Sequence, residues 1–362
     1  MIAGGGTGGH IIPALAVASE LLARQPAEIL FVGTPRGLET RLVPEAGFKL
    51  HLVEVGPLNN VSFKTRLHTL FALPRNLAEC KRLIREFKPD IVFGVGGYAS
   101  GPAMGAALQM KVPTVAFEPN AVPGLANRLI GRWVQAAAVN FPSAASWFRD
   151  VEVTGIPVRP EFFKLQPNFE SEPHLLVFGG SQGARLFNDT LPRIATDLLT
   201  AVPGLTILHQ SGMRHVDATR AAYEKSGADS ELWQVESFLT DMPVRFRKAT
   251  LVMARGGAST VAELAAASKP ALLVPFAAAA DNHQQRNAEE MVNVGAAVMM
   301  TENALDPPGT LLAKLIQLLR DPKKLAAMGT AARTQAHLGA AERIAERLIE
   351  VAQARVQSSY SS

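Results

Sequence analysis

Short apolar runs and stretches of helical periodicity alternate along the whole chain. Apolar runs at residues 1–3, 29–32, 91–95 and 113–117 predict buried strands, and residues 48–55 alternate like a half-buried strand. Helical spacing is found at residues 11–24, 73–87 and 124–132. Strands that alternate with helices indicate an α/β fold with a parallel sheet. The first run is short for a central strand, so we expect a local loss of stability, or a start that is trimmed or misassigned.

The same plan begins again in the second half of the chain. Residues 156–173 contain four prolines and no hydrophobic period, which predicts a linker. A strand at 175–178, a glycine turn at 179–183 and a helix at 184–199 then repeat the order of residues 2–22. Further patterns predict strands at 205–209, 232–235, 251–254, 271–276 and 296–300, and helices at 311–319, 322–335 and 340–356.

This repeat predicts two Rossmann-like domains with parallel sheets, facing each other across a cleft between their glycine turns. We place the first domain at residues 1–158 and the second at 159–339. Residues 340–362 are expected to form a C-terminal helix that packs back toward the first domain, with a disordered tail at 358–362.

Residues 251–287 hold the densest group of chemical signals. A buried strand at 251–254 leads into a glycine pair and then a helix, whose start is marked by Thr260 and Glu263 at capping-box spacing. Free N–H groups at such a helix start favour phosphate, and Arg255 would add a fixed positive charge. Alternatively, Glu263 only caps its helix and Arg255 pairs with a surface carboxylate.

A polar segment at residues 281–285, DNHQQ, follows the next predicted strand. Its amide and imidazole groups can hydrogen-bond neutral hydroxyls. Phosphate recognition and sugar recognition therefore lie side by side in the sequence, which predicts a nucleotide-sugar site.

The first glycine turn, MIAGGGTGGH, allows several interpretations. Gly4, Gly6 and Gly9 satisfy the GxGxxG pattern of dinucleotide-binding proteins. The strand at 29–32 ends without the acidic residue that would hold a ribose, so the dinucleotide interpretation fails. The turn could instead bind a diphosphate or present His10 as a base; as an alternative, His10 only caps or packs the helix.

Polar side chains also follow two strands of the first half. Tyr98 lies in a third glycine turn after the strand at 91–95, and Glu118 and Asn120 follow the strand at 113–117. Ligands bind at the carboxyl ends of such strands, so these groups could bind and deprotonate a hydroxyl. Loop hydrogen bonding is the alternative.

The charge distribution suggests a partner. The net charge is +4, and residues 64–88 contain seven basic and two acidic side chains. Apolar residues flanked by these cations suit an anionic membrane surface, reached through residues near 61–88; a solvated face is the alternative. Nucleic acid is not expected, because aromatic residues do not alternate with the basic ones.

One cysteine, Cys80, excludes a disulfide framework, and the absence of a transmembrane run or signal peptide predicts a cytoplasmic protein.

Several common catalytic motifs are missing. The sequence has no Asp-x-Asp pair for a metal-bound diphosphate, no Walker lysine and no Gly-x-Ser-x-Gly. We therefore expect no metal or other cofactor. A leaving diphosphate would be stabilised by helix N-termini and Arg255.

Six stretches, in order, resemble one family. They are GGGTGGHIIPALAVA (4–18), GVGGYASGP (94–102), FEPNAVPGLANR (117–128), TGIPVRPEF (154–162), GGSQGARLFN (179–188) and ARGGASTVAELAAASKPALLVPF (254–276). They resemble the MurG family of bacterial transferases, which move N-acetylglucosamine from UDP-N-acetylglucosamine onto lipid I to give lipid II for peptidoglycan. The resemblance implies the GT-B glycosyltransferase fold, inversion at the sugar, no required metal, and residence at the cytoplasmic face of the inner membrane.

The resemblance also implies roles for matching residues. On the first domain these are Thr7, Gly8 and Gly9 in the loop near the donor, His10 as candidate base, Tyr98 and Glu118 on the acceptor side, and Asn120 on the donor sugar. On the second domain they are Arg159 and Ser181 as donor contacts, Leu239 with a backbone that reads uracil, Ala258, Ser259, Thr260, Val261, Ala262 and Glu263 over the phosphates and ribose, and Gln284 and Gln285 on the sugar. Either His10 or Glu118 would take the proton.

The sequence departs from the family pattern at a few positions. Pro119 replaces a frequent glutamine, Gly256 stands where serine is common, and residues 277–280 are plainer than usual. Three alternatives stay open: a glycolipid synthase that uses diacylglycerol, a UDP-N-acetylglucosamine epimerase of the same fold, and a non-catalytic nucleotide-binding module.

Overall fold

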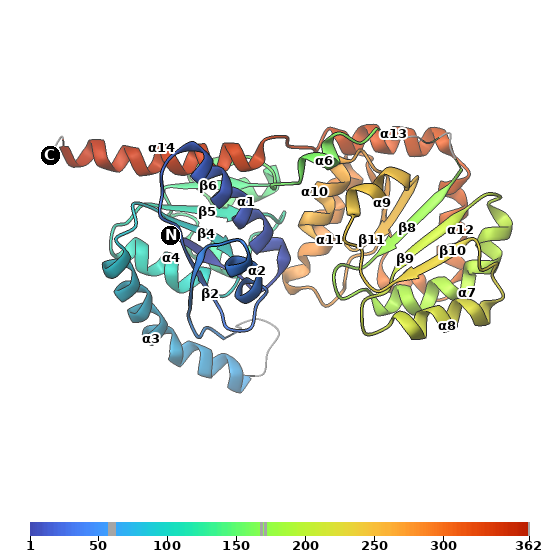
Figure 1. Cartoon of the computed structure of the whole chain (residues 1–362), viewed down its shortest axis with the longest axis horizontal. Helices are drawn as coiled ribbons and strands as arrows, with labels where there is room; N and C mark the ends of the chain where they lie inside the picture. Colours follow the sequence, from blue (N-terminus) through green and yellow to red (C-terminus); the bar gives the residue numbers. More distant parts are fainter. Residues whose placement is uncertain (57–62, 167–168, 170–171, 361–362) are drawn as a thin grey trace. The chain divides into compact units, whose positions relative to one another are not determined.

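The computed structural model describes residues 1–56, 63–166, 169 and 172–360 of the chain, and it divides into two compact units. The first unit comprises Met1–Pro157 with Gly339–Ser362, and the second comprises Val158–Leu338. Each unit has one sheet in which every pairing is parallel (Figure 1). The predicted fold class, two Rossmann-like parallel-sheet domains, is therefore confirmed. No described helix is both long enough and apolar enough to cross a membrane.

The first unit is built on a seven-stranded sheet of order β3-β2-β1-β4-β5-β6-β7. Its strands are β1 (Ile2–Gly4), β2 (Leu30–Gly33), β3 (Lys49–Leu52), β4 (Val92–Gly96), β5 (Thr114–Glu118), β6 (Ala136–Val139) and β7 (Val151–Val153). Its helices are α1 (Gly8–Arg24), α2 (Glu39–Glu45), α3 (Phe63–Phe87), α4 (Ser100–Gln109), α5 (Leu125–Ile130), the 3-10 turn η1 (Pro142–Trp147) and α14 (Ala340–Tyr360). Short β1 is fully buried and pairs on both sides, with β2 and with β4.

The C-terminal helix α14 belongs to this first unit and packs on α1. Its apolar side, including Ile344 and Leu348, is buried. Arg343 donates to both carboxylate oxygens of Glu152, and Arg24 of α1 reaches Glu346 at 3.0 Å. The helix continues to Tyr360, so the predicted disorder is wrong for residues 358–360; residues 361–362 lie outside the described part.

The second unit is built on a six-stranded sheet of order β10-β9-β8-β11-β12-β13. Its strands are β8 (His174–Phe178), β9 (Thr206–Gln210), β10 (Trp233–Glu236), β11 (Leu251–Ala254), β12 (Ala271–Leu273) and β13 (Ala297–Met299). Its helices are α6 (Pro160–Phe163), α7 (Arg185–Ala201), α8 (Val216–Ser226), α9 (Met242–Lys248), α10 (Ala258–Ala266), α11 (His283–Asn293), α12 (Gly309–Leu319) and α13 (Pro322–Arg333), with 3-10 turns η2 (Ala280–Asn282) and η3 (Glu302–Leu305).

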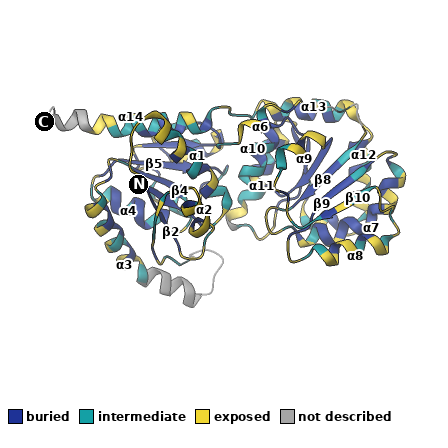
Figure 2. Ribbon diagram, in the orientation of Figure 1, coloured by how far each residue is buried: buried dark blue, intermediate teal, exposed yellow. Residues whose placement is uncertain are grey.

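The central strands of both sheets are buried on both faces, as expected for parallel sheets covered by helices (Figure 2). Several features differ from the sequence-based predictions, among them the linker and strand β6. The predicted linker contains α6, whose Phe162 is fully buried and meets Phe246 edge-to-face at 5.1 Å between ring centroids. Strand β6 was not predicted, because its alanine-rich sequence carries little β propensity and is made a strand by burial between its neighbours.

Candidate functional site

The turn after β1 carries the first group of predicted site residues. Thr7 is the N-cap of α1, and Gly8 and Gly9 are its first two residues, so the helix starts earlier than predicted. Thr7 Oγ1 and Nδ1 of His10 are 3.3 Å apart. The His10 ring lies against the turn after β4, because a Cβ built on Gly96 would come within 3.0 Å of Nε2. The imidazole is therefore held at the carboxyl edge of the sheet.

A buried carboxylate that was not predicted fills the inside of this turn. Glu39, the first residue of α2, is fully buried and accepts hydrogen bonds from the Gly6 N–H at 2.7 Å and from the N–H and hydroxyl of Thr34, both at 2.8 Å. A Cβ added to Gly5 or Gly37 would overlap the carboxylate. Glu39 stands shortly after β2, but its partner Gly6 lies 33 residues earlier in the sequence, so no local pattern identifies the contact.

The turns after β4 and β5 bring further predicted residues to the same edge. The sheet order places β4 between β1 and β5, and the Gly5 N–H donates to the Gly96 carbonyl at 3.3 Å. Tyr98 is 47% exposed, so its phenol is open to a ligand. His10, Tyr98 and the residues after β5 therefore share one edge of the first sheet.

Glu118 is buried at the end of β5, and its contacts do not suit a proton acceptor. One oxygen accepts from the N–H and the side-chain amide of Asn120 at 3.0 and 3.1 Å; the other accepts from the Gly124 N–H and from Asn127 Nδ2 at 3.0 and 2.9 Å. Burial raises the pKa of Glu118, and these four donors oppose that shift. Because four donors use the positions a carboxylate offers, Glu118 holds the 118–127 loop, and the prediction of a base there is revised.

The turn after β8 lies at the carboxyl edge of the second sheet. Ser181 is exposed there, and Gly183, at φ 72°, packs so closely on the Ser211 carbonyl that a Cβ would overlap it. Gln210, at the end of β9, donates to the Gly180 carbonyl at 2.8 Å and accepts from the Leu239 N–H at 3.4 Å. The Leu239 N–H is therefore engaged within the protein.

Helix α10 starts over this edge, but not as the capping box predicted. Its N-cap is Gly257, which places Ser259 and Thr260 inside the first turn, where their side chains make no cap. Glu263 therefore does not cap the helix, and no described residue donates a hydrogen bond to its carboxylate. Burial raises the pKa of Glu263 to about 7, while the positive charge of Arg159 opposes the shift. Arg159, which is predicted to be a donor contact, is therefore close enough to Glu263 to act on its charge.

Arg255 requires a correction, because its charge is balanced within the protein. Its guanidinium is 2.7 Å from Glu302 and donates to the carbonyls of Val274 and Pro275. It also lies over the rings of Phe187 and Phe276, at 4.7 and 5.4 Å. Glu302 in turn accepts from the Ala277 N–H at 3.1 Å. Arg255 therefore orders the strand ends instead of presenting an open cation.

The polar segment at 281–285 meets the start of α10 through its backbone. A Cβ on Gly256 would overlap the Gln284 carbonyl, and Asn287 Nδ2 donates to the Gly256 carbonyl at 3.1 Å. A larger residue at position 256 would therefore collide with the backbone of this segment. Gln284 Oε1 accepts from the Phe276 N–H at 3.0 Å, and exposed Gln285 pairs with Glu289 at 2.9 Å.

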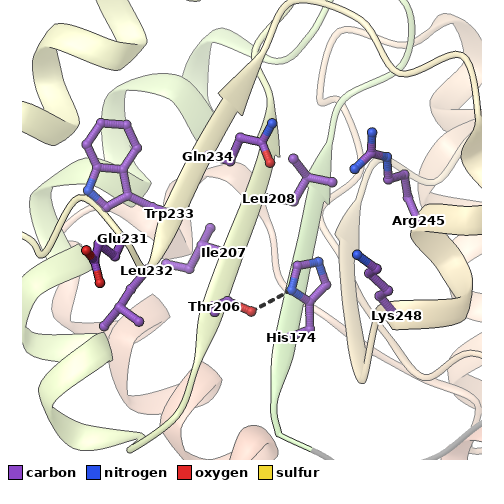
Figure 3. A pocket seen from close by; sticks show the side chains of 10 residues that line it. All are labelled: His174, Thr206, Ile207, Leu208, Glu231, Leu232, Trp233, Gln234, Arg245 and Lys248. Carbon is purple, nitrogen blue, oxygen red and sulfur yellow. Dashed lines mark hydrogen bonds between the residues drawn. The ribbon is translucent and has the colours of Figure 1, made fainter.

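One hollow of the second unit lies away from the predicted site residues. A shallow groove of about 350 Å³ runs across β9 and β10 toward α9 (Figure 3). It reaches His174 and Thr206, which begin β8 and β9, so it opens toward the amino edge of the sheet, opposite the predicted site. Burial and nearby cations lower the pKa of His174 to about 4, leaving a neutral imidazole there. No predicted site residue lines this groove.

Among the residues that the structure describes, no three His, Cys, Asp or Glu side chains gather closely enough to bind a metal ion. Besides Glu39, the contributors that sequence reasoning missed are Asn127, Gln210 and Glu302. Gln210 ends β9 and Glu302 follows β13, but their partners are distant in sequence, so no local pattern identifies them. Asn127 lies on α5, only nine residues after its partner Glu118.

Comparison with known proteins agrees with both halves of this arrangement. Residues 1–139 match the glycosyltransferase family 28 N-terminal domain, and residues 174–344 match the glycosyltransferase family 28 C-terminal domain.

Full-length relatives narrow the family. The chain is 43% identical to the UDP-N-acetylglucosamine–N-acetylmuramyl-(pentapeptide) pyrophosphoryl-undecaprenol N-acetylglucosamine transferase of Solibacter usitatus, over 97% of this chain and 96% of that one. It is 43% identical to the enzyme of the same name from Anaeromyxobacter dehalogenans strain 2CP-1, over 98% and 93%. The crystal structure of Acinetobacter baumannii MurG superimposes with a TM-score of 0.80 at 29% identity, over 97% and 98% of the two chains. The chain therefore belongs to the MurG family of N-acetylglucosamine transferases, within glycosyltransferase family 28.

Proposed function

We propose that this chain transfers N-acetylglucosamine from UDP-N-acetylglucosamine to the 4-hydroxyl of the muramyl sugar in lipid I, giving lipid II and UDP for peptidoglycan synthesis. Lipid I is the undecaprenyl-pyrophosphoryl-N-acetylmuramyl-pentapeptide. The observation that carries the proposal is the 43% identity, over 97% of the chain, to a transferase named for this donor and acceptor.

The donor is assigned to the second unit. The diphosphate lies at the N-termini of α7 and α10, next to Ser181 and the segment Ala258–Glu263, where N–H groups and helix dipoles favour negative charge. Glu263 accepts hydrogen bonds from the ribose hydroxyls, and the Leu239 carbonyl faces the uracil. Gln284 and Gln285 reach the sugar, and Arg159 adds positive charge near Glu263.

The chemistry is assigned to the first unit. His10 takes the proton of the acceptor hydroxyl as that oxygen attacks the anomeric carbon from the face opposite UDP, which inverts the sugar. Thr7, Gly8 and Gly9 shape the helix start that carries His10. Tyr98 contacts the acceptor, and Glu118 orients Asn120 toward the transferred sugar through the hydrogen bonds that hold its loop. UDP leaves onto the helix N-termini, which supply electrostatic stabilisation.

We also propose that the chain binds the cytoplasmic face of the inner membrane as a peripheral protein, through the basic surface near residues 61–88. The supporting observation is that Arg75, Arg82 and Arg85 are exposed along α3, beside exposed Leu73. Residues 61–62 and the side chains of 63–71 lie outside the described part. Sedimentation with vesicles tests this: binding to phosphatidylglycerol that weakens with salt is expected, and equal binding to neutral vesicles contradicts it.

The activity is tested with radiolabelled UDP-N-acetylglucosamine offered to lipid I or to diacylglycerol in detergent. Label is expected in the lipid I product alone, with one UDP released per sugar transferred. Label in diacylglycerol identifies a glycolipid synthase, and turnover without acceptor identifies an epimerase. Donor binding with no UDP release in the presence of lipid I identifies a binding module.

A further inference from the structure

We propose that Glu39 is a positioning residue for His10: its buried carboxylate binds the Gly6 N–H of the first glycine turn and thereby fixes the start of α1. The inference rests on the role of His10 in the proposed function. It concerns a residue that touches neither the donor site nor His10 directly.

The contacts of α2 clamp Gly6 from both sides. The Gly6 N–H donates to Glu39 Oε2 at 2.7 Å, and the Gly6 carbonyl accepts from the Leu38 N–H at 3.4 Å. Gly6 has φ 97°, a left-handed conformation in which its N–H can turn inward toward a carboxylate. The next residue, Thr7, is the N-cap of α1, and its carbonyl accepts from the His10 N–H at 3.2 Å. The clamp therefore acts one residue before the helical turn that carries the imidazole.

The carboxylate cannot move without displacing its surroundings. Glu39 is fully buried, and its other oxygen is held by the Thr34 N–H and hydroxyl, both at 2.8 Å. Glycines at positions 5, 33 and 37 leave space for the side chain, since a Cβ on any of them would collide with it. A charged acceptor bound by backbone N–H groups gives strong, directional hydrogen bonds.

Replacing Glu39 by glutamine tests this, because the shape is kept and one acceptor oxygen becomes a donor. Whichever way the amide turns, its NH₂ faces a backbone N–H, either that of Gly6 or that of Thr34. We expect Glu39→Gln to lower kcat for lipid I glycosylation about tenfold or more, because a small misplacement of a catalytic group is costly. The KM for UDP-N-acetylglucosamine is expected to stay within about twofold, since the contacts to the uridine diphosphate are assigned to the second unit.

Thr34→Val is the matched control. It removes the hydroxyl donor to Glu39 but leaves the bond between Glu39 and Gly6. A rate within about threefold of the parent is expected, because each remaining charged hydrogen bond still fixes the carboxylate. An equal fall in kcat for both variants would mean that general stability of the buried cluster controls the rate, and would overturn the inference.

Gly37→Ala perturbs the carboxylate from outside the turn, and alanine can adopt this backbone conformation. We expect a fall in kcat in the same direction as for Glu39→Gln. Full activity in a variant with an unchanged melting temperature would overturn the inference.

The double variant separates the two proposals. If Glu39 acts through His10, His10→Ala/Glu39→Gln is no slower than His10→Ala alone, because the second change has nothing left to misplace. A further loss by the full factor seen for Glu39→Gln would contradict positioning. A fully active His10→Ala would instead remove His10 from the proposed function, whatever the behaviour of Glu39.

Discussion

The turn after β1 and the turn after β8 occupy the same place in their sheets. Each follows a strand flanked on both sides, and each leads into a helix of 17 residues. In the first turn the Gly6 N–H is bound by the carboxylate of Glu39. In the second, Gln210 donates to the Gly180 carbonyl, and no described acidic side chain accepts from residues 179–183.

The two turns therefore differ in charge, although both have the same strand–turn–helix order. The first turn has a buried carboxylate bound to its backbone, whereas no described acidic side chain accepts from the backbone of the second turn. Like charges at close range oppose binding strongly where water is excluded. The repeated architecture therefore supports two tasks: the second turn can receive a diphosphate, and the first can hold a base.

The largest effect is expected from removing the base. His10→Ala should lower kcat by about 10²–10⁴-fold, the usual contribution of general base catalysis, with donor affinity unchanged. Steady-state assays with lipid I and calorimetric titration of UDP measure the two quantities. His174→Gln is the control, because that histidine lies in the groove at the amino edge and should leave both unchanged. Weaker UDP binding in His10→Ala would place the first turn in the donor site and contradict the proposed difference in task between the two turns.

A smaller effect should follow from distorting the second turn. Gly183→Ala combines a φ of 72° with a collision against the Ser211 carbonyl, so UDP affinity should fall about 5- to 150-fold, corresponding to roughly 1–3 kcal/mol of strain. Gly204→Ala is the matched control: its φ is 75°, but a Cβ there meets nothing closer than 3.9 Å. It should lower the melting temperature without changing UDP affinity. Equal losses of affinity would show that general strain, not the turn, is measured.

The ionisation of Glu263 should change the affinity for UDP-N-acetylglucosamine by about tenfold. Its pKa is about 7 without ligand, and ribose hydroxyls bind best to the ionised carboxylate, so binding favours proton release. Affinity for UDP-N-acetylglucosamine should therefore rise about tenfold from pH 6 to pH 8 and level off above the pKa. In Glu263→Gln the affinity should be lower and independent of pH. A pH dependence that persists in this variant would assign the titration to another group.

The smallest effect on transfer is expected from Arg255 and Glu302. Because they pair with each other, Arg255→Gln and Glu302→Gln should each reduce the free energy of unfolding by about 3 kcal/mol, and the double variant by less than the sum. The rate at a temperature where all variants are folded should stay within about threefold of the parent. A loss of kcat in Arg255→Gln alone would support the original prediction that Arg255 stabilises the leaving diphosphate.

The sequence predicted what depends on local pattern. The strand at Leu251–Ala254 matches the structure at both ends, because a buried apolar run between two breakers is unambiguous. The prediction for the start of α10 was wrong, because Thr260 and Glu263 satisfy capping-box spacing by sequence alone. In the structure the N-cap is Gly257, and Glu263 does not cap the helix. Spacing alone does not say where a helix starts.

The exposed residues of the candidate site could be predicted from the sequence, but the residues that hold them in place could not. His10, Ser181 and Tyr98 stand in glycine turns at strand ends, where position alone suggests function. Glu39 binds Gly6 across 33 residues, and Glu302 binds Arg255 through a separate 3-10 turn. Such partners are brought together only by the fold, so a single sequence gives no direct signal for them.

The return of α14 to the first unit affects the order in which the protein is completed during synthesis. Residues 1–157 emerge from the ribosome first, but the surface of α1 that α14 covers stays open until residues 339–362 follow, after the whole second unit. Val158–Leu338 is one continuous segment and can fold as it emerges. The first unit is therefore completed after the second, and a nascent chain that has not yet reached residue 339 still exposes the surface of α1 that α14 covers.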